Sequence, residues 1–168
     1  MAAEDIIKYL NLVVDGRGYA GKIKEWSPPA LTLATQDFRA GGMDTAVDLD
    51  MGMEKLTCSG VLTSYDDNVL ALWGLKKGAG VQLTARGSME SLDGTTKPIV
   101  HNMTGKMISL ERGTWGPGNE PALTFNLSLV FYREVVNGRE IHLIDALNMI
   151  RVVDGVDQLA EHRKNIGI

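Results

Sequence analysis

The strongest constraint on the fold lies between residues 121 and 134, where apolar side chains occupy every second position. The apolar set is Leu123, Phe125, Leu127, Leu129 and Phe131. Successive side chains of a strand point to opposite sides, so strict alternation predicts a long strand with one buried face. Asn137-Gly138 follows this segment and favours a two-residue hairpin turn. We therefore expect residues 139–144 to return as an antiparallel strand.

Turn signals divide the rest of the chain into further strands. Asp93-Gly94 separates residues 81–92 from 97–110, and both segments are rich in Val, Ile, Leu and Thr. This predicts a second antiparallel pair. Near the start, residues 9–14 and 19–26 flank a glycine-rich turn. Pro28-Pro29 then ends that ladder, because proline has no N–H to donate.

Residues 30–38 and 55–63 also alternate, and a connection over residues 39–54 joins them. This connection is too long for an ordinary hairpin loop. Long connections inside a compact domain are usually functional.

Two short helices are expected. Ser64 and Asp67 have the spacing of a capping box before residues 65–73. The second helix is predicted over residues 154–165, with Asp154 as N-cap and Gly167 just beyond its end. Its apolar face, which we expect to dock mainly on the core of its own subunit, would consist of Val156, Leu159 and Ala160.

The predicted fold is mainly β: a single domain over residues 1–168 with two packed antiparallel sheets, sandwich-like or barrel-like, and one or two short helices. Strands joined by short turns, without an alternating strand and helix order, favour this class over a doubly wound sheet. A length of 168 residues with 44% hydrophobic side chains suits one such domain.

Charge and cysteine content exclude several classes of protein. The chain has 17 basic and 21 acidic residues, and no run of Lys or Arg that would track a phosphate backbone. Aromatic side chains, which single-strand-binding barrels stack on bases, make up only 6%. Cys58 is the single cysteine, so the fold has no intrachain disulfide. The start of the chain has no basic segment before a long apolar one, so we expect synthesis in the cytoplasm without a signal peptide.

One glycine motif suggests an enzyme. Gly16, Gly18 and Gly21 match the spacing of the dinucleotide-binding fingerprint. That fingerprint requires a helix after the last glycine, whereas residues 22–26 alternate like a strand and run into Pro28-Pro29. A glycine-rich hairpin explains the motif better, and a small dinucleotide-binding enzyme stays as the alternative.

No other motif predicts catalysis. His101, His142 and His162 fall on different expected elements, without the spacing of a zinc site or a neighbouring nucleophile motif. Pairs of acids in loops and first helical turns are ordinary structural features. We therefore expect no catalytic residue, no cofactor and no bound metal.

The two ends and the long connection carry motifs whose order is specific. They are Lys8-Tyr9-Leu10-Asn11, Pro29-Ala30-Leu31, Phe38-Arg39-Ala40-Gly41-Gly42-Met43-Asp44, Val47-Asp48-Leu49-Asp50-Met51-Gly52, Asn137-Gly138-Arg139-Glu140, Asn148-Met149-Ile150, Asp154-Gly155-Val156-Asp157 and Arg163-Lys164-Asn165-Ile166-Gly167. Together they resemble the major tail tube protein of contractile-tailed bacteriophages and of phage-tail-like bacteriocins. The resemblance covers the first and last thirds of the chain, while residues 57–121 match by strand pattern.

The resemblance implies a non-enzymatic building block located in the virion tail or the bacteriocin particle. Rings of six subunits would stack into the inner tube, and one sheet of each subunit would join its neighbours to line a continuous barrel. The implied partners are further copies of the chain, the tail sheath protein outside, the tape measure protein and DNA in the lumen, and the baseplate and tail terminator at the ends. No small-molecule substrate is implied. Whether the particle carries DNA or is an empty bactericidal device stays open.

We expect the 39–54 connection to contact neighbouring subunits. Gly41 and Gly42 would permit a bend, Phe38 and Met43 would supply apolar contacts, and Arg39, Asp48 and Asp50 would supply polar ones. A solvated surface loop is the alternative.

A channel that passes a polyanion should expose few cations. Three strand faces of small uncharged residues meet this requirement and are the candidate channel lining: Thr32, Ala34 and Gln36; Thr57, Ser59 and Thr63; and Thr124, Asn126 and Ser128. Alternation assigns these residues to faces but leaves open whether the faces meet a channel or the outer solvent.

Overall fold

The computed structural model describes residues 3–74 and 80–168. In this part of the chain the strands form antiparallel sheets, and two short helices accompany them. This confirms the predicted mainly β fold class. The strands are β1 Ile6–Val14, β2 Arg17–Gly18, β3 Ile23–Ser27, β4 Leu33–Phe38, β5 Val47–Met53, β6 Thr57–Leu62, β7 Val81–Glu90, β8 Thr96–Glu111, β9 Leu123–Val136, β10 Arg139–Asp145, β11 Ile150–Val153 and β12 Val156–Asp157. The helices are α1 Asp67–Leu70 and α2 Ala160–Ile166.

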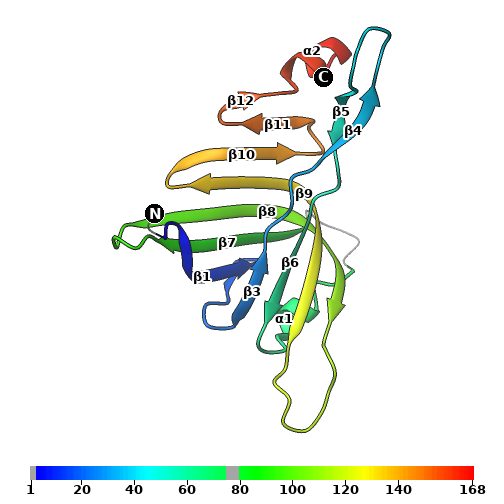
Figure 1. Cartoon of the computed structure of the whole chain (residues 1–168). Coiled ribbons are helices and arrows are strands. Elements are labelled where there is room, and N and C mark those ends of the chain that lie inside the picture. The colour runs from blue at the N-terminus through cyan, green and yellow to red at the C-terminus, as the bar shows by residue number, and fades with distance from the viewer. Residues whose placement is uncertain (1–2, 75–79) are drawn as a thin grey trace.

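The long strand β9 organises the main sheet, which has ten strands in the described part of the chain. One edge of β9 pairs with β8, while the other edge pairs with β6 over residues 123–128 and with β10 over residues 131–136. Figure 1 shows β6 and β10 leaving β9 in different directions. The sheet therefore divides into a lower section that contains β6 and an upper section that runs through β10 to β12.

The core lies in the lower section, where the strands curve around a single apolar cluster. Its fully buried side chains come from β1, β6, β7, β9 and α1 and include Leu12, Leu62, Leu83, Phe125 and Val69. The predicted alternation is confirmed from Leu123 to Leu129, since Leu123, Phe125, Leu127 and Leu129 are all buried. It is wrong beyond that point: the register shifts at Val130, so Tyr132 is buried while Phe131 is only half-buried.

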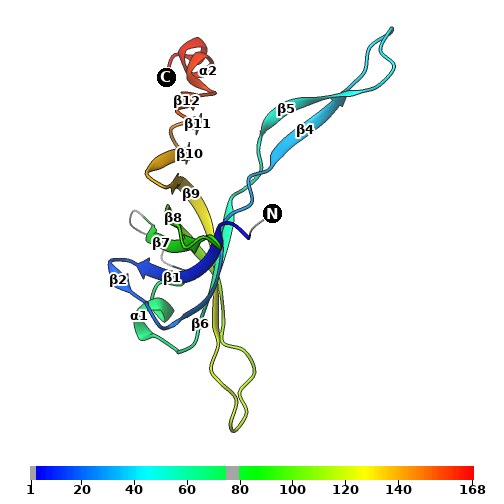
Figure 2. The ribbon, with the colours of Figure 1, turned by 60° about the vertical axis from the view of Figure 1, so that its left-hand side comes forward.

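Strands β4 and β5 form a separate two-stranded sheet that projects from the body, and we call residues 33–53 the arm. Figure 2 shows the arm pointing away from the end of the molecule that carries the β8–β9 loop. The predicted 39–54 connection therefore contains a strand, β5, which pairs with β4. Its alternation of Val47, Leu49 and Met51 with aspartates is a strand pattern in its own right.

The boundaries of the C-terminal helix differ from the prediction of residues 154–165. Asp154 has φ 51 and Gly155 has φ 80, and these two residues form the turn between β11 and β12. Asp-Gly is a preferred pair for such a hairpin turn, so Asp154 is a turn residue and not an N-cap. The helix α2 begins only at Ala160, and Gly167 ends it with φ 80, as expected.

The predicted apolar face of that helix does not form. Val156 lies in β12 and is 61% exposed, Ala160 is exposed, and Leu159 is half-buried. No side chain of α2 itself is buried. The helix thus covers little of the core of its own subunit. The first helix is also shorter than predicted, and Asp66 caps it in place of Ser64 by accepting from the backbone N–H groups of Asn68 and Val69.

Among the described residues, no helix has the length and apolar character that a membrane crossing requires.

Candidate functional site

The arm exposes apolar side chains on one of its faces. Phe38 pairs with Val47 across the two strands, and Gln36 pairs with Leu49. The exposed fractions of Phe38, Val47 and Leu49 are 48%, 44% and 43%. An isolated two-stranded hairpin is marginally stable in water, and a contiguous exposed apolar surface is typical of an interaction site. The arm therefore has the character of a contact surface.

The opposite face of the arm is acidic. Asp37 and Asp48 occupy directly opposed positions on β4 and β5. Like charges in such positions destabilise a strand pair. A cation supplied from outside the arm would relieve this repulsion.

The tip of the arm holds most of the residues predicted for subunit contacts. Phe38, Arg39, Gly41, Gly42 and Met43 lie together there, and the Nε of Arg39 donates to the carbonyl of Met43 at 3.2 Å. Gly42 has φ 91, a conformation that favours glycine. Of the two other predicted contact residues, Asp48 lies within β5 and Asp50 nearer the root of the arm.

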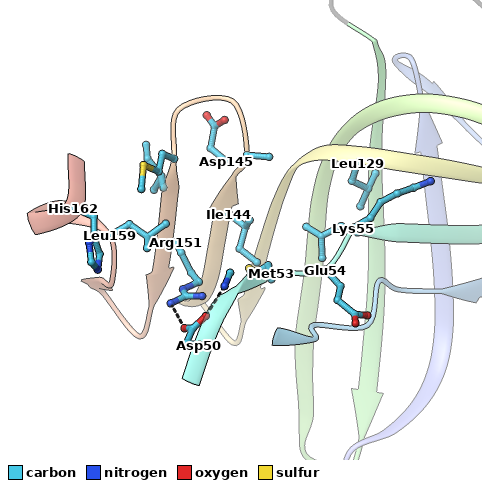
Figure 3. Close-up of a pocket in the computed structure, with 15 residues that line it drawn as sticks. Asp50, Met53, Glu54, Lys55, Leu129, Ile144, Asp145, Arg151, Leu159 and His162 are labelled. Atoms are coloured by element: carbon cyan, nitrogen blue, oxygen red, sulfur yellow. Dashed lines mark hydrogen bonds and ion pairs between the residues drawn. The ribbon is translucent and has the colours of Figure 1, made fainter. Parts of the chain in front are cut away.

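Asp50 connects the root of the arm to the C-terminal strands. Its carboxylate accepts from Arg151 on β11 at 2.7 Å and from the backbone N–H of Gly52 at 2.8 Å (Figure 3). These bonds, that from Arg151 first, hold the pKa of Asp50 below its usual value. Arg151 was not a predicted site residue, because nothing in the sequence indicates a contact across a hundred residues.

A cleft of about 690 Å³ lies beside this ion pair, between the root of the arm and the C-terminal strands. Figure 3 shows Met53, Ile144 and Leu159 among its lining side chains, which come from several elements. Because these residues are far apart in sequence, no local pattern predicts the cleft. Its apolar lining adds to the surface that a partner would cover.

The predicted small polar residues of β6 and β9 lie on one face of the sheet. Thr57 pairs with Ser128, Ser59 with Asn126, and Val61 with Thr124. Cys58 and Leu127, which point to the other side, are buried in the core. Thr63 follows the end of β6, where its hydroxyl donates to the carbonyl of Lys22 at 3.2 Å. The third predicted set, Thr32, Ala34 and Gln36, lies at the start of the arm and within β4, and thus belongs to a different sheet.

Strands β3 and β8 add charged residues to this polar face. Lys106 pairs with Ser128, Glu111 with Thr124, and Glu25 with Val61. The face therefore includes a cation, Lys106, although we expected a face without Lys or Arg. Simple alternation places Lys106 opposite the buried Met107, but nothing in the sequence shows that this part of β8 lies beside β9.

The glycine motif has no helix behind it. Gly16 and Gly21 have positive φ values of 80 and 79 in turns, and β3 follows Gly21. A dinucleotide fingerprint needs a helix N-terminus at that point to receive the pyrophosphate. The arrangement gives no support to the enzyme alternative.

Two of the histidines meet at one carboxylate. His101 on β8 and His142 on β10 flank Glu134 on β9, at 3.3 Å and 2.7 Å. Their spacing in the sequence gives no sign of this cross-strand cluster. Burial lowers the pKa of His101, and the nearby Glu134 carboxylate partly opposes that shift. In the described part of the chain, no group of three His, Cys, Asp or Glu side chains is arranged to hold a metal ion.

Comparison with known proteins identifies the family. The model of the family described as phage tail tube protein FII matches residues 4–167. The tail tube protein of Escherichia phage P2 is 29% identical over 174 residues, which covers all of both chains. The major tail tube protein of Serratia phage KSP20 is 28% identical over 158 residues, which covers 92% of this chain and 91% of the relative.

Solved structures share the fold at low sequence identity. One such structure is a chain in the PVC sheath-tube complex, an extracellular contractile injection system in its extended state. It aligns with this chain at a TM-score of 0.58 and 11% identity, and the alignment covers 79% of this chain and 90% of the PVC chain. A chain of the anti-feeding prophage baseplate has a TM-score of 0.52 at 11% identity, with 77% and 95% covered. This chain therefore shares its fold with a chain of each of these two complexes. The match of the family model over residues 4–167 shows that the chain belongs to the phage tail tube protein FII family.

Proposed function

We propose that this tail tube protein is a structural subunit that assembles into rings of six, and that the rings stack into the inner tube of a contractile tail. Its relatives are tail tube proteins over their full length, which supports a structural role and not an enzymatic one. The tube would form the channel for DNA delivery or for penetration of an envelope.

The exposed apolar face of the arm is the observation that carries this proposal. Phe38, Val47 and Leu49 lie on a hairpin that projects from the body and has no core of its own. Burial of such side chains against another subunit would stabilise both the hairpin and the assembly. In this proposal Arg39, Gly41, Gly42 and Met43 at the tip also contact neighbouring subunits, while Asp48 and Asp50 provide polar contacts.

The polar face of β6 and β9 is our proposed channel lining. Thr57, Ser59, Thr63, Thr124, Asn126 and Ser128 would face the lumen, and the three predicted residues at the start of the arm and on β4 would take part in arm contacts. Glu25, Glu111 and Lys106 also lie on this face, so its charges are of both signs and small uncharged side chains separate them. Such a surface would hold a passing polyanion only weakly.

The remaining partners follow from a position inside a contractile tail. The sheath would surround the tube, the tape measure protein and DNA would occupy the lumen, and the baseplate and terminator would bind the two ends. The subunit would be made in the bacterial cytoplasm and would act in the phage tail or the bacteriocin particle.

Deletion of residues 41–50 tests the role of the arm. We expect the deletion to leave a folded subunit that no longer polymerises. Electron microscopy should show tubes for the wild type, and sedimentation should show only small species for the deletion. A milder variant, Phe38→Ser with Val47→Ser, removes only the apolar pair and should also block assembly, whereas Thr35→Ser on the other face should not. Normal tubes from both arm variants would contradict the proposal.

A titration with dinucleotides checks the enzyme alternative, and we expect no binding.

A further inference from the structure

The loop between β8 and β9, residues 112–122, carries a tryptophan that its own subunit leaves uncovered. Trp115 is 75% exposed, and every residue from 112 to 121 is exposed except Gly116. Tryptophan is largely buried in most folded proteins, and at protein interfaces it is enriched among the residues that dominate the binding energy. Trp115 is therefore a candidate anchor for a partner.

Tyr65 holds this tryptophan in a defined position. The Tyr65 ring packs on the core, and its centroid lies 6.3 Å from that of the Trp115 ring. The Tyr65 hydroxyl donates to the carbonyl of Arg112. Within the loop, the backbone N–H of Asn119 donates to the carbonyl of Gly116 at 3.1 Å and closes a turn. A side chain that is already held in place loses little conformational freedom on binding, which favours its use as an anchor.

The cleft at the root of the arm offers an apolar surface that suits such an anchor. Met53, Ile144 and Leu159 are among the side chains that line it (Figure 3). Its volume of about 690 Å³ lies in the range of pockets that enclose whole small molecules, roughly 300–1,000 Å³. The cleft can therefore accommodate an indole ring together with part of the loop that carries it.

The loop and the cleft lie at opposite ends of the subunit. Figure 2 shows the β8–β9 loop at one end, and the arm and the C-terminal strands, between which the cleft lies, toward the other. The strands of the proposed lining, β6 and the first half of β9, run between these ends, so the two ends face along the channel. Identical rings that stack head to tail join two different surfaces of the subunit, because such a contact is heterologous. Stacking therefore brings the loop end of one subunit to the cleft end of the next.

Charged residues on the two surfaces complement each other. The loop begins at Arg112 and has Glu120 near its end, while Glu54 and Lys55 both line the cleft. In the described part of the chain, none of these four side chains belongs to a salt bridge. Each surface thus brings one cation and one anion that a second copy of the chain can pair. Such pairing adds specificity and fixes the orientation of docking.

We propose that the β8–β9 loop of each subunit docks into the cleft of a subunit in the adjacent ring, with Trp115 as the apolar anchor. This inference rests on the proposed assembly of stacked rings and specifies a contact between them. Trp115 would exchange contact with water for contact with the apolar lining of the cleft, and burial of a large aromatic side chain stabilises an interface. The occupant of the cleft is thus a second copy of the chain.

Trp115→Ser removes the anchor and leaves the core intact, because this side chain is exposed. We expect the variant to form closed rings that stack poorly, with a mean tube length in electron micrographs that is shorter than for the wild type by roughly a factor of ten. The matched control is Leu92→Ser in the turn between β7 and β8. It removes a side chain of similar exposure, 74%, that belongs to neither surface, and should leave the tube length unchanged. Tubes of wild-type length from Trp115→Ser would overturn the inference.

A cysteine pair tests the contact directly. Leu159→Cys in the cleft is combined with one of three changes in the loop: Thr114→Cys, Pro117→Cys or Asn119→Cys. The loop and the cleft lie at opposite ends of one subunit, whereas a disulfide requires Cα atoms within about 7 Å, so any such bond must join two subunits. After oxidation of assembled tubes, at least one combination should give covalent chains longer than one ring on a non-reducing gel, because a contact between rings links an open column of subunits. Each single variant should stay monomeric, since the native Cys58 is buried.

A further pair, Ala40→Cys at the tip of the arm with Leu159→Cys, asks whether the arm of another subunit fills the cleft, and we expect no link between subunits. A link from this pair alone, covalent chains that end at the size of one ring, or assembled tubes without any link would overturn the inference and leave the proposed function intact. Failure of the wild-type protein to form rings would instead remove the proposed function.

Discussion

The ring of Phe125 on β9 lies over Gly60 on β6, so closely that a Cβ at position 60 would be 2.5 Å from the ring Cζ. Phe125 is fully buried at the centre of the core. Position 60 therefore requires glycine because of the available space, and the aromatic ring packs directly on the backbone of the neighbouring strand.

Gly60→Ala should thus destabilise the subunit. The new methyl group would force Phe125 away from its packed position, which we expect to lower the free energy of unfolding by about 1–3 kcal/mol. Urea denaturation of dissociated subunits measures this loss. The matched control is Gly18→Ala, because nothing lies within 4 Å of a Cβ at position 18, and its midpoint should differ little from the wild type. Equal midpoints for the two variants would contradict the argument.

Loss of the Asp50 charge should loosen the arm. Arg151 holds the pKa of Asp50 below its usual value, so the ion pair contributes above the unfolded pKa of about 3.8 and is lost as the pH falls through the lower folded value. Asp50→Asn should therefore speed hydrogen exchange in β4 and β5 at neutral pH, while the core strands stay protected. Asp44→Asn at the tip is the control, with no expected effect on exchange near the root. Unchanged exchange in Asp50→Asn would show that backbone bonds alone hold the arm.

Acid should destabilise the subunit through His101. Burial lowers the pKa of this histidine in the folded state, with Glu134 as a partial counterweight and Tyr132 packed at 5.7 Å between ring centroids. The unfolded chain, with a histidine pKa of about 6.5, then binds a proton that the folded chain does not. The contribution of neutral His101 to the free energy of unfolding is therefore complete above about pH 6.5, and it falls as the pH drops from there toward the folded pKa. Denaturation midpoints between pH 5 and 8 should show this slope.

Replacement of His101 identifies the source of the slope. His101→Gln should flatten the change in midpoint over this pH range, whereas His162→Gln on the exposed face of α2 should leave it as in the wild type. A wild-type slope in the His101 variant would assign the effect to other groups.

The sequence predicted the strands well wherever one face packs on the core. The alternation around Phe125 and the Asn137-Gly138 turn both appear in the structure, because local patterns directly determine strand faces and hairpins. The prediction that a helix begins at Asp154 was wrong, because Asp154 suits a helix N-cap and a hairpin turn equally well. The contact of Asp50 with Arg151 and the meeting of two histidines at Glu134 depend on long-range pairing, which no local pattern encodes. Lys106 was missed because its place on the polar face depends on the pairing of β8 with β9, which is also a long-range contact.

Positive charge on the β9 face provides the test of the proposed channel lining. Asn126→Lys with Ser128→Lys would repeat in every subunit, so a lumen lined by β9 would gain dense positive rings. Assembled tubes should then retain DNA, and their retention should weaken steeply as salt is raised, because phosphate contacts release counterions. Filter binding of purified tubes at increasing salt measures this, and in a DNA-carrying particle ejection should slow in parallel. Thr95→Lys in the exposed β7–β8 turn adds a cation away from this face and is the control. A second measurement introduces cysteines at positions 126 and 128 and treats intact tubes with a bulky reagent that cannot enter the lumen. If the reagent labels these cysteines readily, the assignment is contradicted.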